Sequence, residues 1–141
     1  HESVRGKDVF IVQSTCKPVN DNLMELLLTI SALRKSSANW ITAIIPYYGY
    51  ARQDWKCKPR VPISAADVAH LLEVVGVDKV VCVDLHSGQT MGFFSHHVTI
   101  DNLAGGAALI DYLIEHSGIK DFNNAVIVSP DAGGVVWAKL I

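Results

Sequence analysis

The stretch KVVCVDLHSGQ, residues 79–89, joins an apolar, β-branched run to a cluster of polar side chains. The run over Lys79–Leu85 predicts a strand that is covered on both faces, as strands of parallel sheets are. Asp84 and His86 stand two residues apart near its end, so their side chains point to the same face. A carboxylate and an imidazole placed together suit a divalent cation, although Asp84 could instead cap the strand end by binding loop amides.

Apolar runs of the same kind recur along the chain, at Asp8–Ser14, Ile41–Tyr48 and Ala125–Ser129, with a shorter run at His97–Ile100. Amphipathic patterns between them predict helices that begin at Asn20 or Asp21, at Ser64, at Ala107 and at Gly133. Asn20 or Asp21 is expected to cap the first helix, and Ser64 with Asp67 to form a capping box on the second. The alternation of strands and helices predicts an α/β fold with a mostly parallel sheet flanked by helices.

Ligands of such sheets bind outside the carboxyl ends of the strands. The segments that follow the predicted strands are polar in every case: Gln13 to Thr15, a basic loop from Gly49 to Ile63, Asp84 to Gln89, and Ser129 to Gly134. We therefore expect the chemistry of this chain to gather at one edge of its sheet.

The basic loop begins inside YYGYARQDWKCKPR, residues 47–60, which mixes four cations with aromatic side chains. Its cations are Arg52, Lys56, Lys58 and Arg60. They could neutralise a polyphosphate while Tyr50 or Trp55 stacks on a base. The alternative is a solvated surface loop, which is the commoner role of a basic loop but leaves exposed tyrosines unexplained.

The segment SPDAGG, residues 129–134, places a carboxylate and two glycines ahead of a predicted helix. Gly133 and Gly134 would let the backbone approach a ligand, and a helix N-terminus favours anions. Asp131 could equally cap that helix. The chain has neither the GxGxxG dinucleotide fingerprint nor a GxxxxGK[ST] phosphate loop.

The composition fits one domain spanning residues 1–141, with 50% hydrophobic and 18% charged residues. The formal net charge of −2 gives no global attraction to nucleic acid or membrane surfaces. Cys16, Cys57 and Cys82 form no CxxC pair and favour a reducing compartment. No run approaches the roughly 20 apolar residues of a membrane helix. A zinc site and a Ser-His-Asp hydrolase are disfavoured, because the required ligand spacing and the GxSxG motif are missing.

Several consecutive motifs resemble those of ribose-phosphate pyrophosphokinases, also called phosphoribosyl-pyrophosphate synthetases. In chain order they are ESVRGKDVFIVQST, VNDNLMELLL, IPYYGYARQD, RVPISAADVA, VDLHSGQ, GFF, IDNL and VSPDAGG. The resemblance covers essentially the whole chain but only the N-terminal domain of the family. It implies a phosphoribosyltransferase-like, Rossmann-like fold that is truncated at both ends.

The resemblance also implies a transferase of nucleotide biosynthesis, a kinase that moves the diphosphoryl group of ATP to ribose 5-phosphate with Mg²⁺. ATP would then contact Arg52, Gln53, Asp54, Lys56, Lys58 and Arg60. Asp84, His86, Asp101 and Asp131 would be metal ligands, and Asp131, Gly133 and Gly134 would bind the substrate. A cytoplasmic homo-oligomer or a hetero-oligomer of synthetases is expected, with neither nucleic acid nor membrane as a partner.

The sequence departs from the family pattern at several positions. Trp55 and Trp137 stand where cations are usual, and Trp40 lies in a stretch where a basic residue is frequent. Ser95 replaces a frequent Asp, and Thr90-Met91 replaces Ile-Gln. The loops that hold the family's catalytic residues and the ribose phosphate lie outside the chain, so the isolated chain is expected to be inactive. A non-catalytic associated subunit or a decayed copy is the alternative to an active synthetase.

Overall fold

The computed structural model of the chain describes residues 2–119 and 124–139. It divides into two compact units, His1–Leu103 and Ala104–Ile141. No helix within the described ranges is both long enough and apolar enough to cross a membrane.

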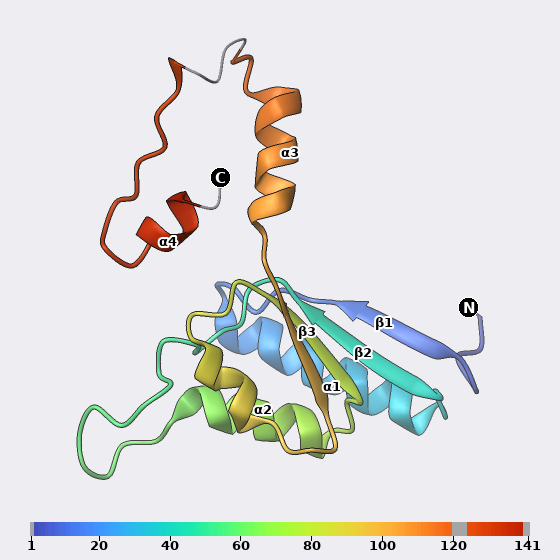
Figure 1. The fold of residues 1–141 in the computed structure, drawn as a ribbon. Helices are drawn as coiled ribbons and strands as arrows, with labels where there is room; N and C mark the ends of the chain where they lie inside the picture. The colour runs from blue at the N-terminus through green and yellow to red at the C-terminus, as the bar shows by residue number, and fades with distance from the viewer. Residues whose placement is uncertain (1, 120–123, 140–141) are drawn as a thin grey trace. The chain divides into compact units, whose positions relative to one another are not determined.

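The first unit is built on a parallel sheet of four strands in the order β1-β2-β3-β4 (Figure 1). Its elements are β1 (Asp8–Val12), α1 (Val19–Lys35), β2 (Trp40–Ile45), α2 (Ser64–Val74), β3 (Lys79–Val83), the 3₁₀ helix η1 (Gly88–Phe93) and β4 (Thr99–Leu103). These strands and helices confirm the predicted α/β class, with shifts at the element ends. The 3₁₀ helix was not predicted from the sequence.

Both long helices cover the same face of the sheet, as Figure 1 shows. This follows from the strand order, because right-handed crossovers that always advance in one direction place every helix on one side. The core between the layers is aliphatic and fully buried, with Leu26 and Ile30 of α1 and Leu72 of α2 facing Ile41 and Val80 of the strands. The apolar stripes read from the sequence are therefore the contact faces of the helices.

The other face of the sheet is only partly covered in the first unit. Phe10 and Val12 of the edge strand β1 are 67% and 69% exposed, and Leu103 of β4 is 51% exposed. The expectation that every strand is buried on both faces is therefore wrong for β1 and β4. Both are edge strands, and α1 and α2 lie on the opposite face.

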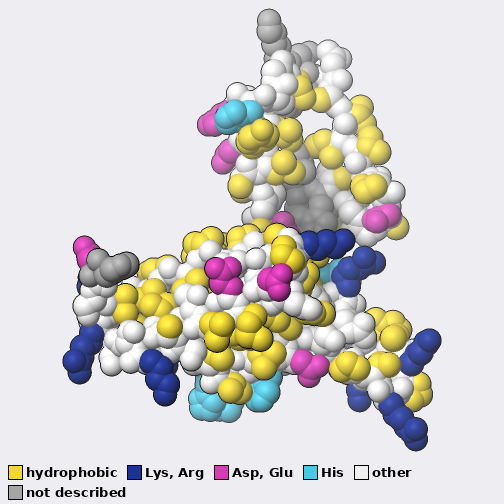
Figure 2. Space-filling view, turned by 180° about the vertical axis from the view of Figure 1, so that it is seen from behind, with side chains coloured by type: hydrophobic (Ala, Val, Ile, Leu, Met, Phe, Trp, Pro, Cys, Tyr) yellow, Lys and Arg dark blue, Asp and Glu magenta, His cyan; other side chains and the backbone are white. Residues whose placement is uncertain are grey.

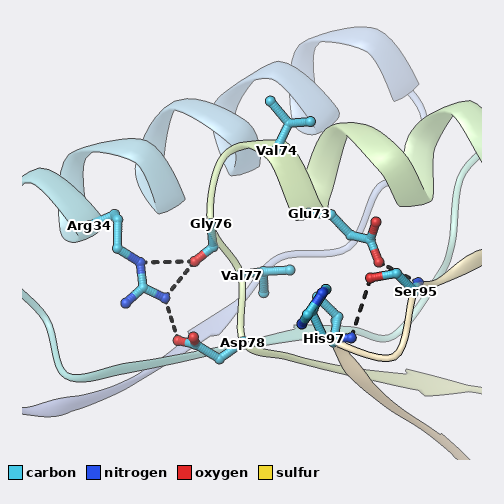
Figure 3. A pocket seen from close by; sticks show the side chains of 9 residues that line it. Arg34, Glu73, Val74, Gly76, Val77, Asp78, Ser95 and His97 are labelled. Carbon is cyan, nitrogen blue, oxygen red and sulfur yellow. Dashed lines mark hydrogen bonds and ion pairs between the residues drawn. The ribbon is translucent and has the colours of Figure 1, made fainter.

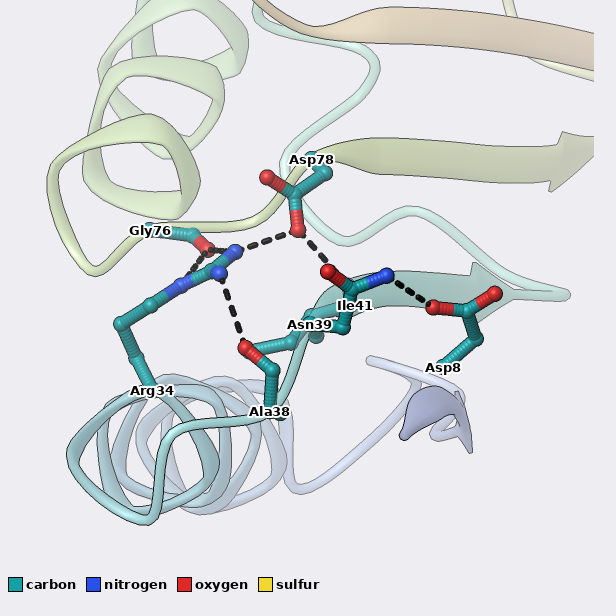
Figure 4. Close-up of polar contacts among 7 residues, drawn as sticks. All are labelled: Asp8, Arg34, Ala38, Asn39, Ile41, Gly76 and Asp78. Atoms are coloured by element: carbon teal, nitrogen blue, oxygen red, sulfur yellow. Dashed lines mark hydrogen bonds and ion pairs between the residues drawn. The ribbon is translucent and has the colours of Figure 1, made fainter. Parts of the chain in front are cut away.

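A polar network joins the amino ends of the strands to the carboxyl ends of the helices (Figure 4). Arg34 of α1 donates to the carbonyl of Gly76 from Nε at 3.0 Å and from Nη2 at 2.5 Å, and it forms an ion pair with Asp78. Asp78 Oδ2 also accepts the main-chain N–H of Ile41 at 2.7 Å. Arg34 from the last turn of α1 and Asp78 from the connection between α2 and β3 thus fix the corner where α1, α2, β2 and β3 meet.

Neither predicted helix cap forms. Helix α1 begins at Val19 after Pro18, and α2 begins at Ser64 after Ile63, with no side-chain cap at either N-terminus. Ser64 is thus the first helical residue rather than the cap, so the predicted capping box is one position out of register. The N–H of Ala65 instead donates to the carbonyl of Gln53 at 3.1 Å, so the basic loop closes this helix end.

The second unit contains α3 (Gly106–His116) and the short α4 (Val135–Ala138). The strand predicted over Ala125–Ser129 is wrong: these residues form no ladder, and Val126 and Val128 are 83% and 79% exposed. Ala125 to Ile127 and α3 line an apolar hollow within this unit. A β-branched run becomes a strand only where a neighbouring strand offers backbone partners, and the four-stranded sheet of the described residues does not include this run.

Candidate functional site

A pocket of about 220 Å³ lies at the carboxyl edge of the sheet, between the segment that follows β2 and the segment that follows β3. Its polar side chains are Arg52 from the first segment and Asp84 and His86 from the second. Tyr47, Tyr48, Ala51, Val83 and Leu85 form the rest of the lining. The pocket therefore brings one cation, one carboxylate and one imidazole around a largely apolar floor, as the position of the polar segments predicted.

Asp84 takes a left-handed backbone conformation at the end of β3, with a φ of +46°. Such a φ is uncommon outside glycine, although Asp tolerates it better than most residues. Two hydrogen bonds from β4 hold the turn: Asp84 N donates to Leu103 O at 2.9 Å, and Leu85 N donates to Asn102 Oδ1 at 3.0 Å. Asp84 and His86 remain exposed while Leu85 is buried, so the apolar residue anchors the two polar ones.

The basic loop is anchored at its start and exposed at its tip. Gln53 N donates to Tyr50 O at 2.9 Å, and Gln89 Nε2 of η1 donates to Asp54 O at 3.2 Å. The side chain of Asp54 is buried, being 7% exposed. Lys56, Lys58 and Arg60 are exposed, like Trp55 at 61%. Figure 2 shows, on the projection at its lower right, Lys and Arg side chains that lie among apolar ones.

The three tyrosines at the start of the loop differ in burial. Tyr48 is 4% exposed and donates from its hydroxyl to Ala65 O at 3.2 Å, whereas Tyr47 and Tyr50 are 54% and 42% exposed. Burial, reinforced by the nearby Cys82, raises the pKa of the Tyr48 phenol well above its usual value. Burial also raises the pKa of the Cys82 thiol to about 12. Both groups therefore stay protonated and uncharged near neutral pH.

Asp101 does not line this pocket. It stands within β4, in register with Val81, and its Oδ2 lies 2.7 Å from Lys79 Nζ in an ion pair. Among the residues that the structure describes, no three His, Cys, Asp or Glu side chains converge as a metal-binding group. The structure thus brings Asp84 and His86 together and leaves Asp101 with a different partner.

Asp131, Gly133 and Gly134 belong to the second unit. Asp131 Oδ1 accepts the N–H of Gly134 at 3.0 Å, ahead of α4. A Cβ on Gly134 would meet Ser129 Oγ at 2.4 Å, so a larger residue at this position would require the Ser129 side chain to move. The geometry of the described turn matches the capping alternative. The side chain of Trp137 lies outside the described part of the chain.

A larger hollow of about 440 Å³ lies at the opposite edge of the sheet (Figure 3). Three of its charged side chains already bind groups of the fold. Arg34 binds Gly76 and Asp78, and Glu73 Oε1 accepts the N–H of Ser95 at 2.5 Å. The polar atoms there close the corner of the fold, which leaves the pocket at the carboxyl edge as the better candidate site.

The residues proposed from the sequence as site residues did not include Thr15, which binds the segment that follows β2. Thr15, which is 2% exposed, follows β1 and binds both Tyr47 and Gly49 through its side chain. Its place after a strand at the carboxyl edge was the available signal. Gln89 was likewise placed at this edge, but its bond to the basic loop was not predictable from spacing.

The chain was compared with known proteins. Residues 1–76 match the family described as the N-terminal domain of ribose phosphate pyrophosphokinase. Ribose-phosphate pyrophosphokinases of Campylobacter jejuni and Helicobacter pylori are 59% and 56% identical over 99% and 98% of the chain. The crystal structure of phosphoribosylpyrophosphate synthetase from Mycobacterium smegmatis superimposes with a TM-score of 0.82 at 46% identity, over 99% of the chain. The chain spans 43%, 42% and 45% of the lengths of these three relatives, respectively.

Proposed function

The chain belongs to the ribose-phosphate pyrophosphokinase family, and on that premise we propose that it forms the ATP-binding part of such an enzyme. The reaction would transfer the diphosphoryl group of ATP to ribose 5-phosphate, giving 5-phosphoribosyl 1-diphosphate and AMP. We expect a cytoplasmic, oligomeric enzyme.

One observation carries this proposal: Arg52 and the pair Asp84 and His86 line the same pocket although 32 residues separate Arg52 from Asp84 in the sequence. A guanidinium binds phosphate oxygens in a bidentate manner, and it keeps its charge at every accessible pH. A site for a polyanion needs such a fixed cation, and phosphoryl transfer depends mainly on positioning and neutralisation of charge.

The donor set of the pocket also fits Mg²⁺, which is usually held by one or two carboxylates together with waters and substrate phosphates. Asp84, with His86 beside it, would hold the ion. Bound Mg²⁺ would neutralise charge on the transferring group. Asp101 and Asp131 remain proposals for further ligands, and Asp131, Gly133 and Gly134 for contacts to the sugar phosphate.

The exposed cations of the basic loop would extend this anion site. Lys56, Lys58 and Arg60 are free of described ion pairs to side chains of the chain, so their charges remain available to phosphates. Gln53 and Asp54, which anchor the loop through their carbonyls, would set its position. By the family resemblance, Trp55 stands where a cation is usual, so this loop would carry one positive charge fewer.

The proposal is tested by calorimetric titration of the 141-residue chain with Mg-ATP. We expect binding that Arg52→Ala and His86→Ala each weaken at least ten-fold. Arg5→Ala is the matched control, because Arg5 is an exposed arginine preceding β1 and does not line the pocket. Binding that all three variants leave unchanged would refute the assignment of the pocket.

A second assay addresses catalysis. We expect no AMP from ATP and ribose 5-phosphate with the isolated chain, since it spans only 43% and 42% of the lengths of two relatives. Fluorescence titration with Mg-ATP, compared with Trp55→Phe, reports whether the loop takes part. AMP release by the purified chain would contradict the expectation of inactivity.

A further inference from the structure

Thr15 is a buried polar residue directly after β1, beneath the pocket wall. Its side chain is 2% exposed, and its hydroxyl makes two hydrogen bonds to the segment that follows β2. Oγ1 donates to the carbonyl of Tyr47 at 2.9 Å and accepts the N–H of Gly49 at 2.7 Å. The main-chain N–H of Thr15 donates to the same Tyr47 carbonyl at 2.9 Å.

These bonds hold the turn at the point where the chain leaves the sheet. Beyond β2 the N–H of Gly49 has no strand partner and needs another one, whereas the carbonyl of Tyr47 also accepts the main-chain N–H of Thr15. The Thr15 hydroxyl supplies both a donor and an acceptor, which only a hydroxyl can do in this space. A Cβ on Gly49 would meet Thr15 O at 2.7 Å, so the two segments pack without room for adjustment.

The clamped turn leads straight into the wall of the pocket. Tyr47 and Tyr48 lie within it, and Ala51 and Arg52 follow it, and all four line the pocket. On the other wall, the main-chain N–H groups of Asp84 and Leu85 are bound by Leu103 and Asn102 of β4. The distance from Arg52 to Asp84 and His86 therefore depends on the position in which Thr15 holds the turn of residues 47–49.

We infer that Thr15 is a positioning residue for the nucleotide: its hydroxyl fixes the turn of residues 47–49 and thereby sets Arg52 opposite Asp84 and His86. This inference rests on the proposed function, because it takes Mg-ATP as the ligand of the pocket. Thr15 touches no ligand itself and acts through the main chain of the turn.

The test compares Mg-ATP affinity of the 141-residue chain with that of Thr15→Val, which keeps the shape and removes the hydroxyl. Thr15→Ala also removes it without adding bulk, and Thr15→Ser restores it. Ile30→Val is the control for lost stability, because Ile30 is a fully buried core residue of α1 that does not line the pocket. Thermal unfolding of each variant shows that binding is measured on folded protein.

We expect Thr15→Val and Thr15→Ala to bind Mg-ATP at least ten-fold more weakly, and Thr15→Ser and Ile30→Val to stay within two-fold of the wild type. If the valine variant does not fold, the alanine and serine variants decide the question by the same criterion. Wild-type affinity in a folded variant without the hydroxyl overturns the inference and leaves the proposed function standing. Absence of Mg-ATP binding by the wild type overturns both.

Discussion

Replacement of Asp78 by alanine tests whether the corner at the amino edge of the sheet stabilises the fold. Asp78 Oδ2 accepts the main-chain N–H of Ile41 at 2.7 Å and pairs with Arg34 (Figure 4). Ile41 is 0% exposed, so its N–H would have no replacement partner in the variant. The main-chain bonds of Asp78 to Ile41 and Thr99 would remain.

The expected loss follows from these two contacts. Removing a charged acceptor from a buried N–H costs about 1.5–3 kcal/mol. The Arg34 side chain is 34% exposed and that of Asp78 26% exposed, so their ion pair adds at most about 1 kcal/mol. We therefore expect a decrease of roughly 3 kcal/mol in the free energy of unfolding. For a unit of this size that corresponds to about 12 °C in Tm.

Thermal unfolding followed by circular dichroism measures this decrease, with Asp8→Ala as the matched control. Asp8 is an exposed carboxylate that binds only the side chain of Asn39 among its described partners, at 2.7 Å. We expect the control to change Tm by less than about 3 °C, as surface substitutions usually do. Mg-ATP affinity should be unchanged in folded Asp78→Ala, because the pocket lies at the other edge of the sheet. A Tm within the range of the control would refute the reasoning.

Three further predictions concern residues near the pocket. Thr90→Val should raise stability to urea by about 1 kcal/mol, because Thr90 Oγ1 is buried without a partner among the described residues; a lower stability would contradict this. Gly49→Ala should lower stability by roughly 2 kcal/mol and weaken Mg-ATP binding, since its Cβ would meet Thr15 O at 2.7 Å; calorimetry and urea unfolding check both effects. Cys82 has a pKa raised from 9.0 to about 12, so above pH 9 the unfolded chain loses this proton first and unfolding becomes easier. We expect a loss on the order of 1 kcal/mol between pH 8 and pH 10, to which buried Tyr48 contributes in the same direction. The loss should be smaller in Cys82→Ala, and an equal loss in that variant would rule out the thiol as the cause.

The strands and long helices of the first unit were predictable because their signals are local. The runs at Lys79–Leu85 and Ile41–Tyr48 are apolar over one strand length, and β3 and β2 follow them closely. The meeting of Arg52 with Asp84 and His86 was also predictable. In a parallel sheet every carboxyl end lies at one edge, so sequence order alone places these residues together.

The predictions that failed depend on contacts between groups that are distant in the sequence, and no local sequence pattern specifies such contacts. Ala125–Ser129 has the composition of a strand but forms no ladder in the described structure. The ion pair of Asp101 with Lys79 on the neighbouring strand was likewise not specified by spacing, and the role of Asp101 as a metal ligand stays a prediction. The capping box at Ser64 does not form, because Ser64 is the first residue of α2 rather than its cap, and the carbonyl of Gln53 accepts the N–H of Ala65. In each case the outcome depends on which group the fold brings close, and the spacing of residues in the sequence does not determine that group.

The order β1-β2-β3-β4 has a consequence for how the chain can be made. Each strand pairs with the one synthesised just before it, so a growing chain always offers the next strand a finished partner. Every residue that lines the pocket lies between Tyr47 and His86. A nascent chain that has passed β3 and its turn has therefore already synthesised the whole lining, and β4 then fixes the turn at Asp84 as it arrives. Since domains form progressively during synthesis, the pocket at the carboxyl edge is expected to form early. Protection of β1 and β2 from hydrogen exchange later than that of β3 and β4 would contradict this order of folding.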